Sequence, residues 1–253
     1  MSYVEGFVVA VPAAKKEAYA QYAAAGVPLF KEFGATRLVE AWGDDVPDGK
    51  ITDFKGAVKA KPDEVVVFAW LEYPSKEARD AATEKMRTDP RAKAMSEGLP
   101  FDGQRMIYGG FAPLGDDKLG GPGQRPGNGK DSGKDSRKTG YIDGCLVPVP
   151  AANKQAYADM AARMSTLFKE YGATRVVDAW ADDVPDGKIT DFKGAVKATG
   201  DEKVVYSWIE WPSKEARDEG WKKVMADSRM HENKAPFDGQ RMIYGGFTPI
   251  VDL

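Results

Sequence analysis

The chain contains the same stretch of roughly one domain length twice. The segment DDVPDGKITDFKGAVKA occurs unchanged at 44–60 and again at 182–198, and FDGQRMIYGGF occurs at 101–111 and again at 237–247. Each copy spans about 110 residues, which is the size of an ordinary domain and much longer than a solenoid repeat. The sequence therefore predicts two domains of one fold, the first at 1–113 and the second at 141–253.

The residues between the copies, 114–140, differ in composition from both of them. They are rich in Gly, Pro, Ser and charged residues and nearly free of large apolar side chains. Such a composition is typical of a flexible, solvated linker. We interpret the chain as a fusion of two protomers that would otherwise pair as a symmetric dimer. Two independent domains joined by a tether are the alternative.

Each copy shows the same alternation of strand and helix patterns. β-branched and aromatic runs predict strands in the first copy at 3–11, 36–42, 64–73 and 105–111. The spacing of apolar residues predicts a helix over 13–33, and Ser75 is a suitable N-cap for a second helix. The order β-α-β-β-α-β is that of the ferredoxin-like unit, an α+β fold with both helices on one face of an antiparallel sheet. We expect the second copy to cover the bare face, so that the two sheets pack against each other.

Charge and composition narrow the range of functions. The 36 Lys and Arg residues and 39 Asp and Glu residues give a formal net charge of −3, which argues against a nucleic-acid partner. No apolar run reaches the roughly 18–20 residues that span a bilayer. The N-terminal segment lacks the positive charge of a signal peptide, so we expect a cytoplasmic protein without a membrane partner. A single cysteine, Cys145, and a single histidine, His231, exclude an internal disulfide and a Cys-rich or two-His metal site within the chain.

Strand alternation divides the side chains of each sheet between two faces. One face is small and aliphatic and suits packed helices, whereas the other combines aromatic residues with one carboxylate per strand. We expect the second face to line an interior shared by the two copies, because an aromatic cavity with a few polar groups is typical of a small-molecule site. The candidate ligand-binding residues are Tyr3, Glu40, Trp42, Phe68, Trp70 and Tyr108, with Tyr141, Asp178, Trp180, Tyr206, Trp208 and Tyr244 in the second copy. The directions of Tyr108 and Tyr244 stay open, since both faces of their strand are mixed.

Four carboxylates are the candidate catalytic groups. The first and third predicted strands should be antiparallel neighbours, which would bring Glu5 to the same end of the sheet as Glu72 and Asp143 to the same end as Glu210. Two close, partly desolvated carboxylates raise the pKa of one of them and can supply a general acid or base. The alternatives are that these carboxylates lie at a solvated rim or pair with Arg and Lys, and that the aromatic residues are ordinary core.

The remaining candidates have simpler interpretations. The acidic loop with Asp44, Asp45, Asp48 and Asp53 lacks the spacing and closing Glu of an EF-hand, which favours turn chemistry or a contact between the copies. Cys145 should fill space as a buried thiol. His231 has no counterpart in the first copy and is expected on the surface. No metal site and no organic cofactor is predicted.

Several blocks resemble a known family. YVEGFVV, LFKEFGATRLVEAWGDDVPDGK, WLEYPSKEARD and FDGQRMIYGGF are similar to segments of the YbaA-like family, domain of unknown function 1428, and the resemblance covers both copies but not the linker. The resemblance implies membership of the dimeric α+β barrel superfamily. That superfamily includes cofactor-free monooxygenases, muconolactone isomerases, haem-dependent chlorite dismutases and small-molecule-sensing domains. Neither copy offers a repeated histidine, which disfavours the haem branch.

These observations together predict a protein that handles an unknown small molecule. The first hypothesis is a cofactor-independent enzyme, monooxygenase- or isomerase-like as the resemblance implies, that uses the inward carboxylates in an aromatic pocket. A ligand-binding or stress-related protein without catalysis is the alternative, and a filled barrel with a purely structural role is a third. A further homodimer of the fused chain is left open.

Overall fold

The computed structural model describes residues 1–115, 139–232 and 234–253. Most of the expected linker, 114–140, lies outside these residues, and the domain limits drawn from it stay a prediction. The two copies fold through the same series of elements, apart from a helix, α4, whose counterpart in the second copy is a 3-10 turn.

The elements of the first copy are β1 (Tyr3–Pro12), α1 (Lys16–Glu32), β2 (Arg37–Asp45), α2 (Phe54–Ala57), β3 (Glu64–Tyr73), α3 (Lys76–Thr88), α4 (Pro90–Glu97) and β4 (Ile107–Pro113). Those of the second copy are β5 (Tyr141–Pro150), α5 (Lys154–Glu170), β6 (Arg175–Asp183), α6 (Phe192–Ala195), β7 (Glu202–Trp211), α7 (Lys214–Ala226) and β8 (Ile243–Asp252). Short 3-10 turns occupy Ala13–Lys15, Gly103–Arg105, Ala151–Asn153, Ser228–Met230 and Gly239–Arg241. Ser75 caps α3 as expected, because its hydroxyl accepts a hydrogen bond from the backbone N–H of Ala78.

The eight strands close into one antiparallel barrel in the order β1-β3-β2-β8-β5-β7-β6-β4. Two of the pairings join the copies: Trp42 on β2 lies opposite Thr248 on β8, and Phe111 on β4 lies opposite Ala181 on β6. The predicted α+β fold is therefore confirmed, with two ferredoxin-like repeats packed sheet to sheet as an intramolecular dimeric α+β barrel. The alternative of two tethered, independent domains is wrong.

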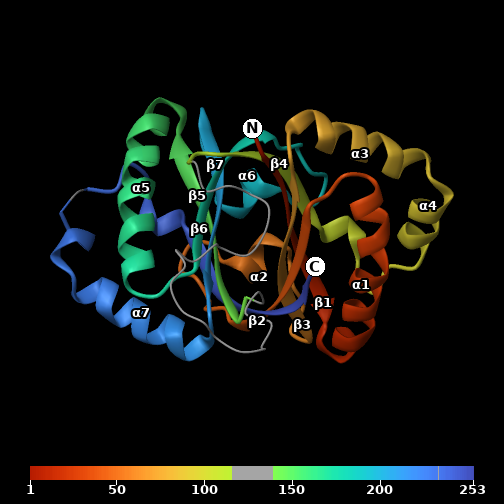
Figure 1. Ribbon diagram of the computed structural model, residues 1–253, viewed down its shortest axis with the longest axis horizontal. Coiled ribbons are helices and arrows are strands. Elements are labelled where there is room, and N and C mark those ends of the chain that lie inside the picture. The colour runs from red at the N-terminus through yellow and green to blue at the C-terminus, as the bar shows by residue number, and fades with distance from the viewer. Residues whose placement is uncertain (116–138, 233) are drawn as a thin grey trace, which may run out of the picture.

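The helices form two outer layers and a central filling (Figure 1). Helices α1, α3 and α4 cover one side of the barrel, and α5 and α7 cover the other. The short helices α2 and α6 contact each other, and their Phe54 and Phe192 belong to the fully buried cluster inside the barrel. The loops that carry α2 and α6 therefore fill part of the space that the two sheets enclose.

The structure corrects the predicted faces of β1 and β2. Phe68, Trp70 and Glu72 on β3 do point into the barrel, as predicted. On β1, however, Val4 and Val8 line the interior, so Tyr3 and Glu5 face the helices. On β2, Val39 and Ala41 line the interior, so Glu40 and Trp42 lie under α1. The prediction is wrong in the same way for β5 and β6 of the second copy. Tyr206, Trp208 and Glu210 point inward as predicted, whereas Tyr141, Asp143, Asp178 and Trp180 face the helices.

The reason is the volume of the rings that cross the barrel. A Cβ atom added to Gly6 on β1 would lie 2.7 Å from Cε2 of Tyr206, and one added to Gly144 would lie 2.9 Å from Cδ2 of Phe68. The inner faces of β1 and β5 must therefore be small to admit rings from the opposite copy. Small side chains on these strands indicate close approach of the other copy, not contact with helices.

Tyr108 and Tyr244 point away from the shared interior. Tyr108 lies opposite Phe7 in the β1–β4 register, and Tyr244 lies opposite Cys145 in the β5–β8 register, which places both on the outer face of the barrel. The two tyrosines are 45% and 55% exposed, respectively. The structure thus answers the question that the sequence left open.

The acidic loops combine turn chemistry with a contact between the copies. Tyr141 of the second copy donates a hydrogen bond to Asp44 at 2.8 Å, and Arg217 pairs with Asp45 at 3.2 Å. Asp53 instead caps α2 by accepting from the N–H of Gly56. Both readings of this loop are therefore correct, each for different residues. Cys145, expected to be buried, is only half-buried in the layer under α5. His231 is exposed, as expected.

Candidate functional site

The inward carboxylates Glu72 and Glu210 form ion pairs that cross between the copies. Arg37 of the first copy donates to both oxygens of Glu210, at 2.8 and 3.1 Å. Arg175 of the second copy donates to both oxygens of Glu72, at 2.7 and 3.0 Å. All four side chains are at most 4% exposed. Of the alternatives considered for these carboxylates, pairing with arginine is the correct one.

The electrostatics of this ion-pair cluster do not favour proton transfer near neutral pH. Burial opposes the ionisation of Glu210, but the positive charges of Arg37 and Arg175 and the N–H of Trp208 outweigh it and lower the pKa to about 2. Trp70 donates in the same way to Glu72, at 3.0 Å. Glu210 is therefore held as a carboxylate, which suits an interface contact better than a general acid.

The predicted aromatic walls of an interior cavity are packed against one another. The rings of Trp70 and Trp208 lie 4.5 Å apart, and those of Phe68 and Tyr206 stack at 4.5 Å with an angle of 12° between their planes. None of the four is exposed to solvent. These four rings are therefore ordinary core, which is one of the alternatives that the sequence left open.

Glu5 and Glu72 do not form the expected pair. In the β1–β3 register Glu72 lies opposite Val4, so Glu5 is on the other face of the sheet. Glu5 pairs instead with Arg79 of α3 at 3.2 Å, and burial raises the pKa of Glu5 despite that arginine. In the second copy Asp143 likewise faces the helices and accepts hydrogen bonds from Arg217 at 2.8 Å and from the indoles of Trp211 and Trp221. The geometric basis of the predicted carboxylate pairs is therefore wrong.

A different carboxylate has the properties of an acid–base group. Glu40 lies on the outer face of β2, under α1, and is only partly buried. The hydroxyl of Tyr19 donates a hydrogen bond to its Oε2 atom at 2.7 Å. Burial raises the pKa of Glu40 to about 7, and the hydrogen bond from Tyr19 limits the rise. Both protonation states of Glu40 are therefore populated near neutral pH.

Aromatic residues surround this carboxyl–phenol pair. The ring of Tyr19 lies 5.7 Å from that of Phe101 and 6.5 Å from those of Tyr22 and Trp42. The ammonium group of Lys16 lies 5.4 Å above the ring of Trp42. Glu40 and Trp42, two of the predicted ligand-binding residues, are thus brought together, but between sheet and helix instead of inside the barrel.

The second copy contains the same arrangement with a shorter carboxylate, Asp178 in place of Glu40. Tyr157 donates to Asp178 at 2.9 Å, and Lys154 lies 5.3 Å above the ring of Trp180. Burial raises the pKa of Asp178, although hydrogen bonds from Tyr157 and Ser207 favour its ionised form. Ser207 lies opposite both Asp178 and Cys145 in the strand registers, at the place where the first copy has Ala69. The two copies therefore offer related but unequal sites.

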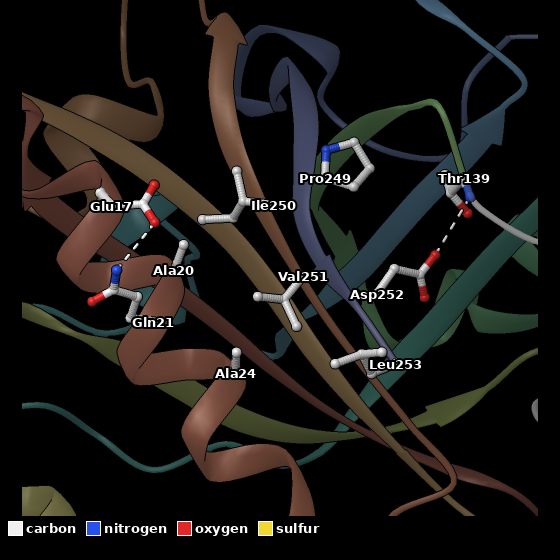
Figure 2. Close-up of a pocket in the computed structure, with 10 residues that line it drawn as sticks. All are labelled: Glu17, Ala20, Gln21, Ala24, Thr139, Pro249, Ile250, Val251, Asp252 and Leu253. Carbon is white, nitrogen blue, oxygen red and sulfur yellow. Dashed lines mark hydrogen bonds between the residues drawn. The ribbon is translucent and has the colours of Figure 1, made fainter.

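A cavity of about 410 Å³ lies on the outer face of the barrel, where the two copies meet (Figure 2). Helix α1 forms one wall and β8 the other, and Val251 on β8 lies opposite Glu40 in the β2–β8 register. The lining residues are Glu17, Ala20, Gln21, Ala24, Thr139, Pro249, Ile250, Val251, Asp252 and Leu253. Both copies contribute walls, so this cavity depends on their assembly into one barrel.

Neither a metal cluster nor a spanning helix is found in the part of the chain that the structure describes. Within 1–115, 139–232 and 234–253, no three or more His, Cys, Asp and Glu residues are grouped so as to hold a metal ion. In the same ranges no helix is long and apolar enough to cross a bilayer.

The family described as protein of unknown function (DUF1428) matches the sequence at residues 2–103 and 140–239. The chain belongs to this family. It is a tandem member, since each match covers one copy. It is 66% identical over 114 residues to "Uncharacterized protein YbaA" from Escherichia coli (strain K12) and from Shigella flexneri, and the alignments cover 45% of this chain and 97% of each relative. Each of these relatives therefore corresponds to a single DUF1428 copy.

Solved structures that resemble the tandem DUF1428 barrel share its fold but little of its sequence. A candidate monooxygenase from Lactobacillus acidophilus NCFM has a TM-score of 0.56 at 11% identity, covering 99% of this chain and 95% of that protein. One from Fusobacterium nucleatum has a TM-score of 0.52 at 9% identity, with 99% and 93% covered. An anthrone oxidase-like protein has a TM-score of 0.50 at 12% identity, with 100% and 92% covered. At such identities the likeness shows the fold alone.

The residues that pair with the carboxylates in each DUF1428 copy were not predicted from the sequence. Arg37 and Arg175 begin the second strand of each copy, and Tyr19 and Tyr157 occupy the same place in the first helix of each copy. Their repetition in both copies was an available signal. Whether an arginine of one copy reaches a carboxylate of the other, however, depends on how the two copies pack. Local sequence patterns do not specify that packing.

Proposed function

We propose that this protein binds a small organic molecule in the α1–β8 cavity and that Glu40 exchanges a proton with it. The observation that carries the proposal is the carboxyl group of Glu40, whose pKa of about 7 results from burial beside that cavity. A general base or acid is most effective when its pKa is near the working pH. This assignment replaces the inward carboxylates, which are paired with arginine.

The chemistry that this arrangement supports is proton transfer without a co-reactant. As a carboxylate, Glu40 removes a proton from one atom of the substrate, and as a carboxylic acid it returns that proton to another atom, which is an isomerisation. The hydroxyl of Tyr19, 2.7 Å from Oε2, holds the carboxyl group in one orientation. The candidate monooxygenases of similar fold lend support to small-molecule chemistry on such a barrel. Removal of a substrate proton would also be the first step of an oxygenation by dioxygen.

A binding protein without catalysis is the second candidate. It is favoured by the position of Glu40, which lies beside the cavity wall and is not itself one of the lining residues. In this case the ionisation of Glu40 would adjust ligand affinity with pH and would not turn the ligand over.

The test begins with a thermal-shift screen of the full chain against pooled metabolites. A ligand at about a hundred times its Kd stabilises a protein by about 2.7 kcal/mol. Ala24→Trp should abolish the shift, because the new ring would fill the cavity between α1 and β8. A shift that persists in this variant contradicts the proposed site.

The two candidates then separate on Glu40→Gln, which keeps the shape of the side chain and loses its proton exchange. Turnover lost with ligand binding retained supports an enzyme, whereas a ligand that the wild-type chain never converts supports the binding protein. Asp178→Asn is the matched control, since it makes the same chemical change in the second copy, away from the cavity. Equal losses in both variants would contradict a special role for Glu40.

A further inference from the structure

The residue on the neighbouring strand that lies opposite each outer acid differs between the two copies. Glu40 on β2 lies opposite Ala69 on β3, and Asp178 on β6 lies opposite Ser207 on β7. Directly opposite residues of an antiparallel pair have Cβ atoms about 4.5–5.5 Å apart, which is within reach of a serine hydroxyl. The first copy therefore presents a methyl group to its acid where the second copy presents a hydroxyl group.

The hydroxyl group gives Asp178 a second hydrogen-bond partner. Tyr157 donates to Oδ1 of Asp178 at 2.9 Å, and the hydrogen bond with Ser207 also favours the ionised form. Together these two bonds oppose the rise in the pKa of Asp178 that burial causes. The acid of the second copy is thus held by side chains from two elements, α5 and β7.

Glu40 has fewer polar neighbours. The phenol of Tyr19 donates to it at 2.7 Å, and within the described parts of the chain no Lys or Arg forms an ion pair with it. Of the two elements that flank β2 in the barrel, β3 places Ala69 opposite Glu40, and β8 places Val251 there. Ala69 is only 2% exposed, so water does not replace the missing donor on that side. The carboxyl group therefore depends on one phenol from α1.

The other titratable groups of α1 do not change this description. Tyr22 is close enough to Glu40 for the carboxylate to contribute to the raised pKa of that phenol, but burial is the larger cause. Lys16 places its ammonium group over the ring of Trp42, at 5.4 Å. The donors to the acid are thus the main difference between the two copies at this place.

We propose that Ala69 is a positioning residue of the first copy: its methyl group leaves Glu40 with a single donor, which makes Glu40, and not Asp178, the proton-exchanging acid of the chain. The inference rests on the proposed function of Glu40 and adds the reason why one copy carries it. Ala69 acts through Glu40 and not on the ligand. The duplicated chain then has one half adjusted for proton transfer and one half whose acid holds its charge more firmly.

The test is a pH titration of both carboxyl groups by NMR of their side-chain carbons, in the full chain and without ligand. Ala69→Ser should lower the midpoint of Glu40 by about one pH unit, because the ionised carboxylate gains a hydrogen bond. Ser207→Ala should raise the midpoint of Asp178 by about the same amount and leave that of Glu40 unchanged. A role in packing alone would not shift the two acids in opposite directions.

Two further variants separate the hydroxyl group from its volume. Ala69→Cys adds one heavy atom at the same place, but a thiol is a much weaker donor, so the midpoint of Glu40 should stay near that of the wild type. Phe7 lies opposite Ala69 in the β1–β3 register, where the second copy has Cys145 opposite Ser207. The double variant Phe7→Cys/Ala69→Ser therefore provides the room of the second copy if Ala69→Ser alone does not fold.

Two results overturn the inference: a Glu40 midpoint that neither Ala69→Ser nor the double variant lowers, or an equal shift in Ala69→Cys. The proposed function is judged separately, by the ligand screen and by turnover. If Ala69→Ser lowers the midpoint of Glu40 but Ala24→Trp alters no ligand response, the effect of Ala69 on its acid is supported and only the proposed ligand site fails.

Discussion

Glu210, inside the barrel, and Glu40, on the outer face of β2, are held in opposite electrostatic states. Inside the barrel, Glu210 is ionised because two arginines surround it, with a pKa of about 2. Under α1, Glu40 has only a phenol as its hydrogen-bond partner, and burial raises its pKa to about 7. The same type of side chain thus serves as a fixed charge at one position and as a proton-exchanging group at the other. For these two side chains the difference lies in the partner, which is two arginines at Glu210 and a phenol at Glu40.

The largest expected effect comes from removing one arginine of the buried ion pairs. Arg37→Met would remove the main partner of the buried Glu210 and should lower the free energy of unfolding by about 3 kcal/mol or more, because a buried charge would lose its compensation. Urea unfolding followed by circular dichroism measures this. Arg87→Met, at an exposed ion pair with Glu84, is the control and should stay within about 0.5 kcal/mol. Equal effects of the two changes would mean that the buried ion pair contributes no more to stability than an exposed one.

The second largest expected effect is a pH dependence of the unfolding free energy that arises from Glu40. Because the pKa of Glu40 is raised from 4.5 to about 7, the folded state binds this proton more tightly than the unfolded chain, and stability falls as pH rises between these values. At about 1.4 kcal/mol for each pH unit, the full decline is about 3 kcal/mol. Glu40→Gln cannot ionise, so its stability relative to wild type should improve by up to that amount between about pH 4 and pH 8.

Denaturant unfolding at the two pH values measures this difference. Asp178→Asn should show the same direction in the second copy, since burial also raises the pKa of Asp178. Wild-type and Glu40→Gln curves that run parallel across the whole pH range would mean that Glu40 is not desolvated in solution.

A smaller effect tests the hydrogen bond that the hydroxyl of Tyr19 donates to Glu40. Tyr19→Phe deletes the donor that favours the ionised form of Glu40 and should raise the pKa of Glu40 further, as followed by NMR of the carboxyl carbon. The loss of one buried hydrogen bond should also cost about 1–2 kcal/mol of stability. Tyr157→Phe is the matched variant and should raise the pKa of Asp178 without changing that of Glu40. An unaltered Glu40 titration in Tyr19→Phe would show that the phenol does not set its ionisation.

The smallest effect concerns the backbone, where the two copies agree. Lys59 and Lys197 both have φ of 48°, in the left-handed region that disfavours a side chain. Lys59→Gly should therefore raise the unfolding free energy by up to about 1 kcal/mol. Lys222→Gly, inside α7, should instead lower it by about 1 kcal/mol. Thermal unfolding of the two variants should move in opposite directions, and a shift of both downward would count against strain at Lys59.

The fold was predictable from the sequence because duplication, strand patterns and the N-cap at Ser75 all indicate the same unit. Which face of each strand points into the barrel was harder to predict. Alternation separates Tyr3 from Val4, but it does not say which of them points into the barrel. The decisive feature is Gly6, whose missing side chain admits the ring of Tyr206 from the other copy. That requirement comes from a contact about 200 residues away in sequence, beyond the range of local patterns.

The candidate site was partly predictable for the same reason. Glu40, Trp42, Asp178 and Trp180 were recognised as functional candidates from their residue types. Their setting between sheet and helix was not, because it depends on the face that β2 and β6 turn to the helices. The unchanged block at 44–60 and 182–198 has a clearer explanation in the structure. Its helices α2 and α6 contact each other near the centre of the barrel, where each copy meets a near-identical partner.

The ion pairs between the copies limit how a duplicated chain of this kind can diverge. Arg37 and Arg175 are each neutralised by an acid from the other copy, Glu210 and Glu72 respectively. A substitution at one of these positions therefore disturbs both halves of the gene, and its repair lies more than a hundred codons away. The outer layers are linked less tightly, as the exchange of Phe7 for Cys145 illustrates, although Asp44 and Asp45 still contact Tyr141 and Arg217 of the other copy. After duplication, the two outer layers can acquire different ligands independently, whereas the four charges at the centre can change only together.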